Sequence, residues 1–467
     1  MNIAQLVEDL HHRGARLRVE QDKLKITAPD NALDSETVAA VRQHKQAIID
    51  FLLANLPVQT QNAHNQSGKV LPLSFNQKAL WSLYRLAPGN PAFNLLFACQ
   101  LPANVNAKAL EAACQILLQR HELLRARFMD TADGPVCTSA ADATVPTEHQ
   151  HTQNLSDAQI NALLNAFGDQ PFQLEQGAVR FLALHNTVAE TVTHYFAFTL
   201  HHIIADFWAC QLLLGELSLL YASIVERRNT KLPAIQLSYA DYARWQQDYL
   251  ATPQSTTDLE YWKQQLSGQL PVLDIPRDRP RPALMSFRGG SHRHALGAAL
   301  SQRIREHARQ NNVTPSTLML TAYTVLLHRC SRQQDILVGT PAAHRNISGS
   351  EWMVGDFSNP IVVRSQIDSS QTFTQLLKQV QTTFVDAIRH QDYPFPLLVE
   401  KLNPVRDASH SPICQAMFLW HKPNEQRLSE ILGHHDSILT HVLPMSGQRG
   451  ATYDLMLSVA DIPDGLV

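Results

Sequence analysis

The residues most suited to chemistry are two adjacent histidines, His201 and His202, followed by Asp206 in the segment HHIIADFW. Imidazole has an unperturbed pKa of about 6.5, so a histidine can accept or donate a proton near neutral pH. If the preceding strand continues, the two rings point to opposite faces and cannot both bind one metal ion. No GxSxG, Walker or HExxH motif lies nearby. These residues alone favour a histidine-dependent transferase, with no metal site predicted.

The elements around this segment predict where the histidines lie. Apolar residues alternate over 192–200, which predicts a strand that runs straight into the histidine pair. His202 shares the parity of the apolar face, so its ring is expected in a sheltered interior. Asp206 is suited to cap the helix that follows, so a purely structural role for the segment stays open. The apolar stripe of that helix is formed by Leu213, Leu217, Leu220 and Ile224.

Length and composition restrict the class of protein. The chain has 467 residues, which suggests two or three folded units. Its 44% apolar and 17% charged residues are typical of soluble globular proteins. The formal net charge is −3 and no basic stripe is present, so a nucleic-acid partner is not expected.

Further features concern location and redox state. The longest apolar run, at 212–221, is interrupted by glycine and glutamate and is too short for a membrane span. The first residues include acidic side chains where a signal peptide would be apolar. The six cysteines have no zinc-like spacing and are expected to be mostly reduced core residues. A cytoplasmic location without membrane association is therefore predicted.

Residues 1–56 have the pattern of a small separate domain. Helical periodicity over 3–14 precedes two short alternating segments around a polar pair, which predict a β-hairpin. A second helix is predicted from residue 34 or 35, with a possible extra helical turn, so the order is αββαα. The polar stretch over 57–69 has no periodicity and is interpreted as a linker.

The rest of the chain has a different pattern. Strand-like and helix-like segments alternate from residue 70, which favours an α/β or α+β architecture. The proline-rich stretch over 271–282 is the best internal boundary. We therefore predict an N-terminal lobe over 70–268 and a C-terminal lobe over 269–467.

The segment HHIIADFW resembles the HHxxxDG motif of condensation domains in nonribosomal peptide synthetases. Other segments resemble further elements of that family in the family's own order, and together they cover nearly all of 71–467. These segments are LPLSFNQKALWSLYRLAPGNPAFN, RHELLRARF, LSYADYARWQQDYL, VGTPAAHRN, GDFSNPIVVR, HQDYPFPLLVEKL and SPICQAMFLW.

This resemblance implies two chloramphenicol-acetyltransferase-like lobes arranged as a V around a central tunnel. His202 would be the catalytic histidine of amide formation, in which a carrier-bound aminoacyl amine attacks an upstream acyl thioester. Asp206 would form a salt bridge with Arg345, and His201 would support the local structure. His202 would act either as a general base or by positioning the amine and stabilising the intermediate, and the sequence leaves both roles open.

The resemblance also implies partners and extends to the N-terminus. Substrates would be carried on the 4′-phosphopantetheine of partner carrier domains, so no cofactor is expected in the chain itself. Residues 1–56 resemble the docking domains of tubulysin-type hybrid synthases, which would bind the C-terminal tail of an upstream subunit at the edge of the hairpin. A donor carrier upstream and acceptor carrier and adenylation domains downstream complete the implied partners. The basic residues of the predicted hairpin would suit an acidic tail, or alternatively would serve only surface solubility. These residues are Arg16, Arg18, Lys23 and Lys25.

Two features depart from the family's pattern. Phe207 stands where the family usually has glycine, and a large ring there could narrow the tunnel. We interpret it as an adaptation to an unusual donor, such as a polyketide-derived acyl chain, which would fit a hybrid polyketide/peptide synthetase. The family normally continues for a few dozen residues after TYDLMLSVADIPDGLV, so the C-terminal end is expected to be truncated.

Alternative functions stay open. A catalytically silent recruitment module would use the same fold to bind a partner enzyme, and Phe207 leaves this possible. The intact His201, His202 and Asp206 count against it. An epimerisation domain keeps the histidine motif but normally follows a carrier domain. Heterocyclisation is disfavoured because those domains replace both histidines with an aspartate-based motif.

Overall fold

The computed structural model divides the chain into two units, Met1–Gln66 and Ser67–Val467. All the motifs that resemble the condensation family lie in the second unit. The structure describes residues 16–20, 23–27, 35–48, 70–140, 143–227, 232–345, 347–405, 407–421, 441–442, 450–462 and 464–467.

The small unit contains the predicted hairpin and the predicted second helix. β1 (Arg16–Glu20) and β2 (Lys23–Thr27) pair antiparallel, and α2 (Ser35–Gln43) follows. Val41 and Ile48 are buried. These two predictions are confirmed. The predicted helix over 3–14 and the linker over 57–69 lie outside the described residues, and of the predicted extra helical turn the structure describes residues 45–48, which are helical.

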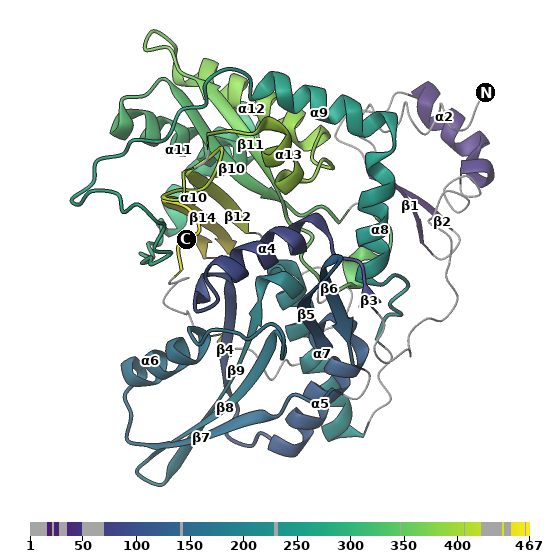
Figure 1. Ribbon diagram of the computed structural model, residues 1–467, viewed down its shortest axis with the longest axis vertical. Coiled ribbons are helices and arrows are strands. Elements are labelled where there is room, and N and C mark those ends of the chain that lie inside the picture. Colours follow the sequence, from purple (N-terminus) through teal and green to yellow (C-terminus); the bar gives the residue numbers. More distant parts are fainter. Residues whose placement is uncertain are drawn as a thin grey trace. The chain divides into compact units, whose positions relative to one another are not determined.

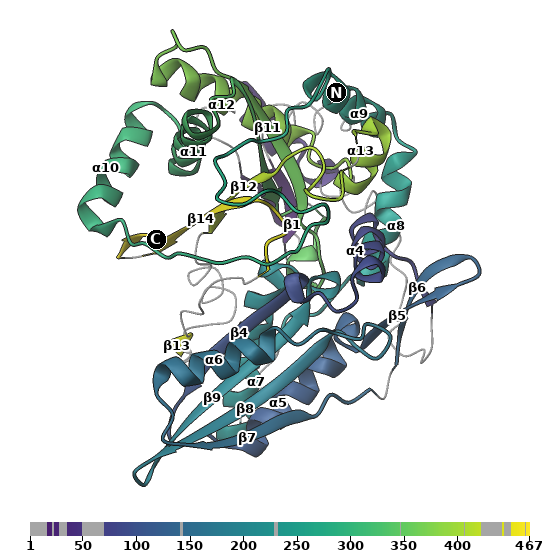
Figure 2. The same ribbon diagram turned by 60° about the vertical axis from the view of Figure 1, so that its left-hand side comes forward.

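The first lobe of the large unit is built on a mixed sheet with strand order β13-β4-β9-β8-β7 (Figures 1 and 2). Its central strands pair antiparallel, and the edge strand β7 pairs parallel with β8. These strands are β4 (Asn94–Leu101), β9 (Thr191–His201), β8 (Val179–Val188) and β7 (Thr147–Gln153). A smaller sheet pairs β3 (Val70–Leu71), β6 (Gly134–Ser139) and β5 (Ala126–Thr131) in that order.

Helices cover both faces of the larger sheet. α5 (Ala107–Arg120) and α7 (Phe207–Glu226) pack on one face, and α6 (Asp157–Gly168) packs on the other. The predicted strand leading into the histidines is confirmed as β9. Both of its faces are buried, because Phe196 and Phe198 pack toward α5 and α7 while Tyr195 and Ala197 pack toward α6.

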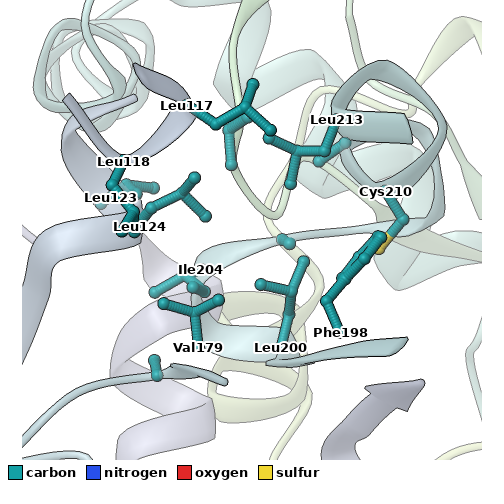
Figure 3. Packing of buried hydrophobic residues seen from close by; sticks show 14 of the residues in the cluster. Leu117, Leu118, Leu123, Leu124, Val179, Phe198, Leu200, Ile204, Cys210 and Leu213 are labelled. Atoms are coloured by element: carbon teal, nitrogen blue, oxygen red, sulfur yellow. The ribbon is translucent and has the colours of Figure 1, made fainter. Parts of the chain in front are cut away.

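The predicted stripe of α7 packs into the main core of the first lobe. Leu213, Leu217 and Leu220 are buried, and Figure 3 shows Leu213 facing Leu117 of α5 and Cys210 beside Phe198 of β9. By length and composition α7 is the one described helix that could span a membrane. It is instead packed as a core helix, since half of its apolar window is buried.

The second lobe has a sheet with strand order β11-β10-β12-β14-β15. β10, β12 and β14 are parallel, and the two outer strands pair antiparallel with their neighbours. The strands are β11 (Asn359–Gln366), β10 (Asp335–Ala342), β12 (Ala416–His421), β14 (Leu455–Ile462) and β15 (Gly465–Leu466). Helices α10 (Gly297–Gln310), α11 (Pro315–Ser331), α12 (Phe373–Arg389), α9 (Pro253–Gln265) and α13 (Phe395–Leu402) surround this sheet (Figure 1).

Segments also cross between the two lobes. β13 (His441–Val442), from the second half of the chain, pairs with β4 in the first sheet. An isolated bridge between Arg288 and Gly450 lies against Ala92 of the first lobe, and a Cβ on Gly450 would come 2.3 Å from the Ala92 Cα. Glycine is therefore required there. The predicted mixed α/β, two-lobed fold is confirmed, although the first sheet also includes a strand from the range 269–467.

Candidate active site

The histidine pair lies at the corner between β9 and α7. His201 is the last residue of β9, and a short 3₁₀ turn (His202–Ile204) follows. The Nδ1 atom of His201 accepts a hydrogen bond of 3.1 Å from the Ile203 N–H, which turns the chain there. The sequence placed His202 on the apolar face of a continuing strand, but the strand alternation stops at His201. His201 is consequently the buried ring, whereas the His202 side chain keeps 28% of its surface exposed.

His201 has the properties of a structural residue. Burial, together with the neighbouring His202, lowers the pKa of His201 to about 3. Its ring lies 6.2 Å from that of Phe93 and 6.2 Å from that of Phe172, between centroids. A neutral, enclosed imidazole that accepts a backbone hydrogen bond holds the corner and is not available to a substrate.

Asp206 caps α7, as its position in the sequence predicts. Its carboxylate accepts a hydrogen bond of 2.8 Å from the Ala209 N–H. Apolar residues on both sides of it, Ile204 and Cys210, are fully buried in the core shown in Figure 3. The corner is therefore anchored by apolar burial on either side of one buried carboxylate.

The same carboxylate meets Arg345, which comes from the segment after β10 in the second lobe. The Arg345 Nη2 atom donates to both Asp206 oxygens, at 2.9 and 3.1 Å. Its Nη1 atom donates to the Ser350 and Met353 carbonyls, and the guanidinium lies 4.1 Å from the centroid of the Phe357 ring. The Phe357 N–H donates back to Asp206, at 3.1 Å. Arg345 thus binds the segment over 345–357 to the histidine corner.

Asp356, in that same segment, was missed by the sequence reasoning. One of its carboxylate oxygens, Oδ2, lies 3.5 Å from the Nδ1 atom of His202. Its other oxygen accepts hydrogen bonds from the Ser358 N–H at 3.3 Å and the Ser358 hydroxyl at 2.7 Å. The only sequence signal was the segment GDFSNPIVVR, in which nothing local distinguishes this aspartate from a loop residue.

These charges control the protonation of His202. Burial lowers the pKa of His202, but the Asp356 carboxylate, with a further contribution from Asp206, outweighs burial and raises the pKa to about 9. The Nδ1 atom is buried and makes no hydrogen bond of normal geometry. The exposed part of the His202 ring therefore lies on atoms other than Nδ1.

Phe207 is the first residue of α7 and lies beside this corner. Its side chain is 43% exposed, although its ring lies 6.0 Å from Phe97 and 4.7 Å from His421, between centroids. His421 ends β12 of the second lobe, and burial lowers its pKa. Phe207 therefore connects the two lobes through an aromatic contact that the sequence did not predict.

The remaining predicted residues belong to the small unit. Arg16 and Arg18 lie on β1, Lys23 and Lys25 lie on β2, and the register places Arg18 opposite Lys25. Among the described residues of the chain, no group of three or more histidine, cysteine, aspartate or glutamate side chains is arranged to hold a metal ion.

Comparison with known families agrees with this fold. Residues 67–466 match the family model of the condensation domain, and residues 3–53 match that of the TubC N-terminal docking domain. The chain therefore belongs to the condensation-domain family, the amide-forming acyltransferase domains of nonribosomal peptide synthetases, and carries a TubC-type docking domain at its N-terminus.

Curated relatives include two components of the linear gramicidin synthase of Brevibacillus parabrevis. One of them is 32% identical over 448 residues, and the other is 36% identical over 390 residues. These matches cover 94% and 82% of this chain but only 6% and 7% of the relatives. The chain thus spans a small fraction of the length of the curated relatives that it matches.

Solved structures with the same fold include the X-domain from teicoplanin biosynthesis and the condensation domain of the monacolin K polyketide synthase MokA. The X-domain has a TM-score of 0.74 at 24% identity, with 88% of this chain and 90% of that chain covered. The MokA domain has a TM-score of 0.72 at 22% identity, with 86% and 91% covered. At these identities the likeness concerns the fold alone.

Proposed function

We propose that this chain docks onto an upstream synthase subunit and condenses a carrier-bound acyl group with a carrier-bound amino acid. The acceptor amine attacks the donor thioester carbonyl, a C–N bond forms and the C–S bond breaks. The amine nitrogen loses one proton and the departing thiolate gains one, so the products are an amide and a free thiol. Both substrates arrive on the 4′-phosphopantetheine arms of partner carriers, in the cytoplasm.

The observation that carries this proposal is the accessibility of the His202 side chain. It is the one member of the His201, His202 and Asp206 motif with an accessible side chain, and because its Nδ1 atom is buried we assign the contact with substrate to Nε2. One imidazole nitrogen is sufficient for this reaction, because the group has to stabilise a developing oxyanion and assist one proton transfer. Most of the remaining rate acceleration would come from bringing two tethered substrates together.

The other motif residues are assigned supporting roles. Asp206 and Arg345 are both buried, and their ion pair joins the first lobe to the segment over 345–357. His201 holds the turn by accepting the Ile203 N–H. We therefore expect these three residues to act through the placement of His202 and not by contact with a substrate.

The docking part of the proposal depends on the hairpin. In the described part of the small unit, β1 pairs only with β2, so a partner strand could be added to the two-stranded sheet. An upstream C-terminal tail with acidic residues is the proposed ligand, because two arginines and two lysines lie on these two strands.

The test is amide formation between an acyl-loaded donor carrier and an aminoacyl-loaded acceptor carrier, followed by intact-protein mass spectrometry. Wild type is expected to transfer the acyl group, and His202→Gln is expected to lose at least about a hundredfold in rate. His149→Gln, at a half-exposed histidine on β7, serves as a control that removes an imidazole away from the histidine corner and is expected to keep the wild-type rate. Equal rates for wild type and His202→Gln would refute a catalytic role for this histidine.

A recruitment module is the second candidate. Phe207 departs from the family's glycine, and the X-domain from teicoplanin biosynthesis, which has the same fold, has been solved in complex with OxyB. If no amide forms with any of several donors while both carriers still bind, this alternative is favoured. Phe207→Gly is then the first variant in which to look for restored activity.

A further inference from the structure

Two carboxylates, one guanidinium and the His202 imidazole meet at the histidine corner. Asp206, Asp356 and Arg345 are buried, and His202 presents its buried Nδ1 edge to this group. Arg345 forms an ion pair with Asp206, to which it donates two hydrogen bonds. Within the part of the chain that the structure describes, His202 is the only cationic group within ion-pair distance of Asp356.

The protonation state of His202 determines the net charge of this buried cluster. Two carboxylates and one guanidinium leave one negative charge uncompensated if the imidazole is neutral. Buried charges are costly unless they are paired, so the cluster is balanced only when His202 carries a proton. Among the described residues, the missing positive charge can come only from His202, which faces Asp356.

Resting on the proposed function, we propose that Asp356 is a positioning residue for His202, which holds the Nδ1–H edge, keeps the ring cationic before reaction and directs Nε2–H toward the substrates. The cationic ring then donates a hydrogen bond to the oxygen of the tetrahedral intermediate. The acceptor amine has to enter in its neutral form, because an imidazolium cannot accept its proton.

Hydrogen bonds hold the Asp356 carboxylate in place beside His202. Both hydrogen bonds from Ser358 go to Oδ1, which leaves Oδ2 facing His202. The Tyr239 hydroxyl of α8 (Tyr239–Leu250) donates to the Asp356 carbonyl and fixes the backbone. Arg345 holds the preceding residues through the Met353 carbonyl. The carboxylate is therefore held before any substrate binds.

The other groups around the corner do not supply a competing charge. Burial keeps His201 neutral by lowering its pKa to about 3. Burial also raises the pKa of Tyr239 and of Tyr242, both on α8, well above the usual range, so their hydroxyls stay protonated. The pKa of His202 near 9, raised by Asp356 against the opposing effect of burial, agrees with the charge count.

The direct test measures the protonation of His202 without catalysis. NMR of the full chain labelled at histidine, with the His202 signal assigned by its loss in His202→Gln, gives the pKa of the ring. Asp356→Asn keeps the size and the acceptor for Ser358 but removes the charge. The pKa is expected to fall from about 9 toward the ordinary value of about 6.5. An unchanged pKa in Asp356→Asn overturns the proposal.

Two further variants separate charge from structure. Ser358→Ala removes the hydroxyl that holds Oδ1 but keeps the carboxylate, so the pKa of His202 is expected to stay raised by at least about one unit. Asp356→Ser removes the charge while keeping a polar group, and it replaces Asp356→Asn if that variant does not fold. A raised pKa in Asp356→Ser would contradict the proposal equally.

The reaction's pH profile gives the second readout. In wild type the rate is expected to rise as the acceptor amine loses its proton, near pH 8, and to fall above about pH 9 as His202 becomes neutral. In Asp356→Asn the falling limb is expected to move down by about two pH units, and a limb that does not move overturns the proposal. If wild type forms no amide, the proposed function fails, and the NMR titration still decides the role of Asp356.

Discussion

The Arg345 guanidinium donates hydrogen bonds to both carboxylate oxygens of Asp206, and this contact joins the two lobes directly beneath the histidine corner. Both side chains are almost completely buried. Removing one partner leaves the other as an uncompensated buried charge. The pair is therefore expected to matter for both folding and activity.

Arg345→Ala is expected to lower the free energy of unfolding by about 3–5 kcal/mol, the usual cost of breaking a buried pair from one side. Urea denaturation measures this value. Arg389→Ala, which breaks a mostly exposed pair with Asp386, is the matched control and should cost about 0–1 kcal/mol. Equal effects of the two substitutions would show that the lobes do not depend on the buried pair.

Glu216, in the middle of α7, tests the core of the first lobe. Its carboxylate accepts hydrogen bonds from Arg120 and His121, at 3.0 and 2.6 Å. Burial raises the pKa of Glu216, but these two partners outweigh it and the pKa is lowered. A carboxyl whose folded pKa is depressed contributes stability above its unfolded pKa, and this contribution is lost as the pH falls through the folded value.

Glu216→Gln is therefore expected to destabilise the chain by about 3–5 kcal/mol at neutral pH, with a difference from wild type that shrinks below about pH 4. The measurement is urea denaturation over a range of pH. Glu111→Gln, at the exposed pair with His149, should change stability by no more than about 1 kcal/mol. A difference that is constant with pH would contradict the assigned ion pair.

His201 gives a prediction for stability at mildly acidic pH. Its folded pKa of about 3 lies below the ordinary value of about 6.5, so the unfolded chain binds a proton that the folded chain does not. Stability should therefore fall as the pH drops below about 6.5, by up to about 1.4 kcal/mol per pH unit for this group. His201→Asn should reduce this slope between about pH 6.5 and 5. Identical slopes would show that His201 takes up a proton in the folded state.

Phe207 is expected to act on substrate choice. Its ring is 43% exposed beside the histidine corner and contacts His421 of the second lobe. Phe207→Gly should change the ratio of kcat/KM for a long and a short acyl donor by about tenfold or more. The free energy of unfolding should fall by about 1 kcal/mol, the usual cost of glycine in a helix.

Phe373→Gly is the matched control for that prediction. Phe373 is also the first residue of a helix, α12, and it is 39% exposed. This substitution should cost similar stability and leave the donor ratio unchanged. Competition between two acyl-loaded carriers, read by mass spectrometry, measures the ratio. If both substitutions change it equally, Phe207 has no specific role.

The docking hairpin gives the last prediction. Reversing the charge at two paired positions of the hairpin, with Arg18→Glu and Lys25→Glu together, should weaken binding of an acidic C-terminal peptide by about tenfold or more. Wild-type binding should also weaken with added salt, and isothermal titration calorimetry measures both effects. A neutral peptide of the same length is the control. Unchanged affinity in the double variant would favour the solubility interpretation of these residues.

The sequence by itself predicted the parts that depend on short-range physics. Strand alternation predicted β9, the spacing of Asp206 predicted a helix cap, and the order of motifs indicated the family before any fold was known. These signals are local because hydrogen-bond caps and side-chain periodicity act within a few residues. The family resemblance also paired Arg345 with Asp206, which no local signal could do.

Only the tertiary structure decided how the site is charged and enclosed. It placed Asp356 against His202, brought His421 onto Phe207, and ended the strand at His201 so that His202 kept an exposed face. The contact of Asp356 with His202 and that of His421 with Phe207 each join segments from different lobes. Such contacts depend on how two separately formed cores pack together, and no periodicity along the chain records that packing.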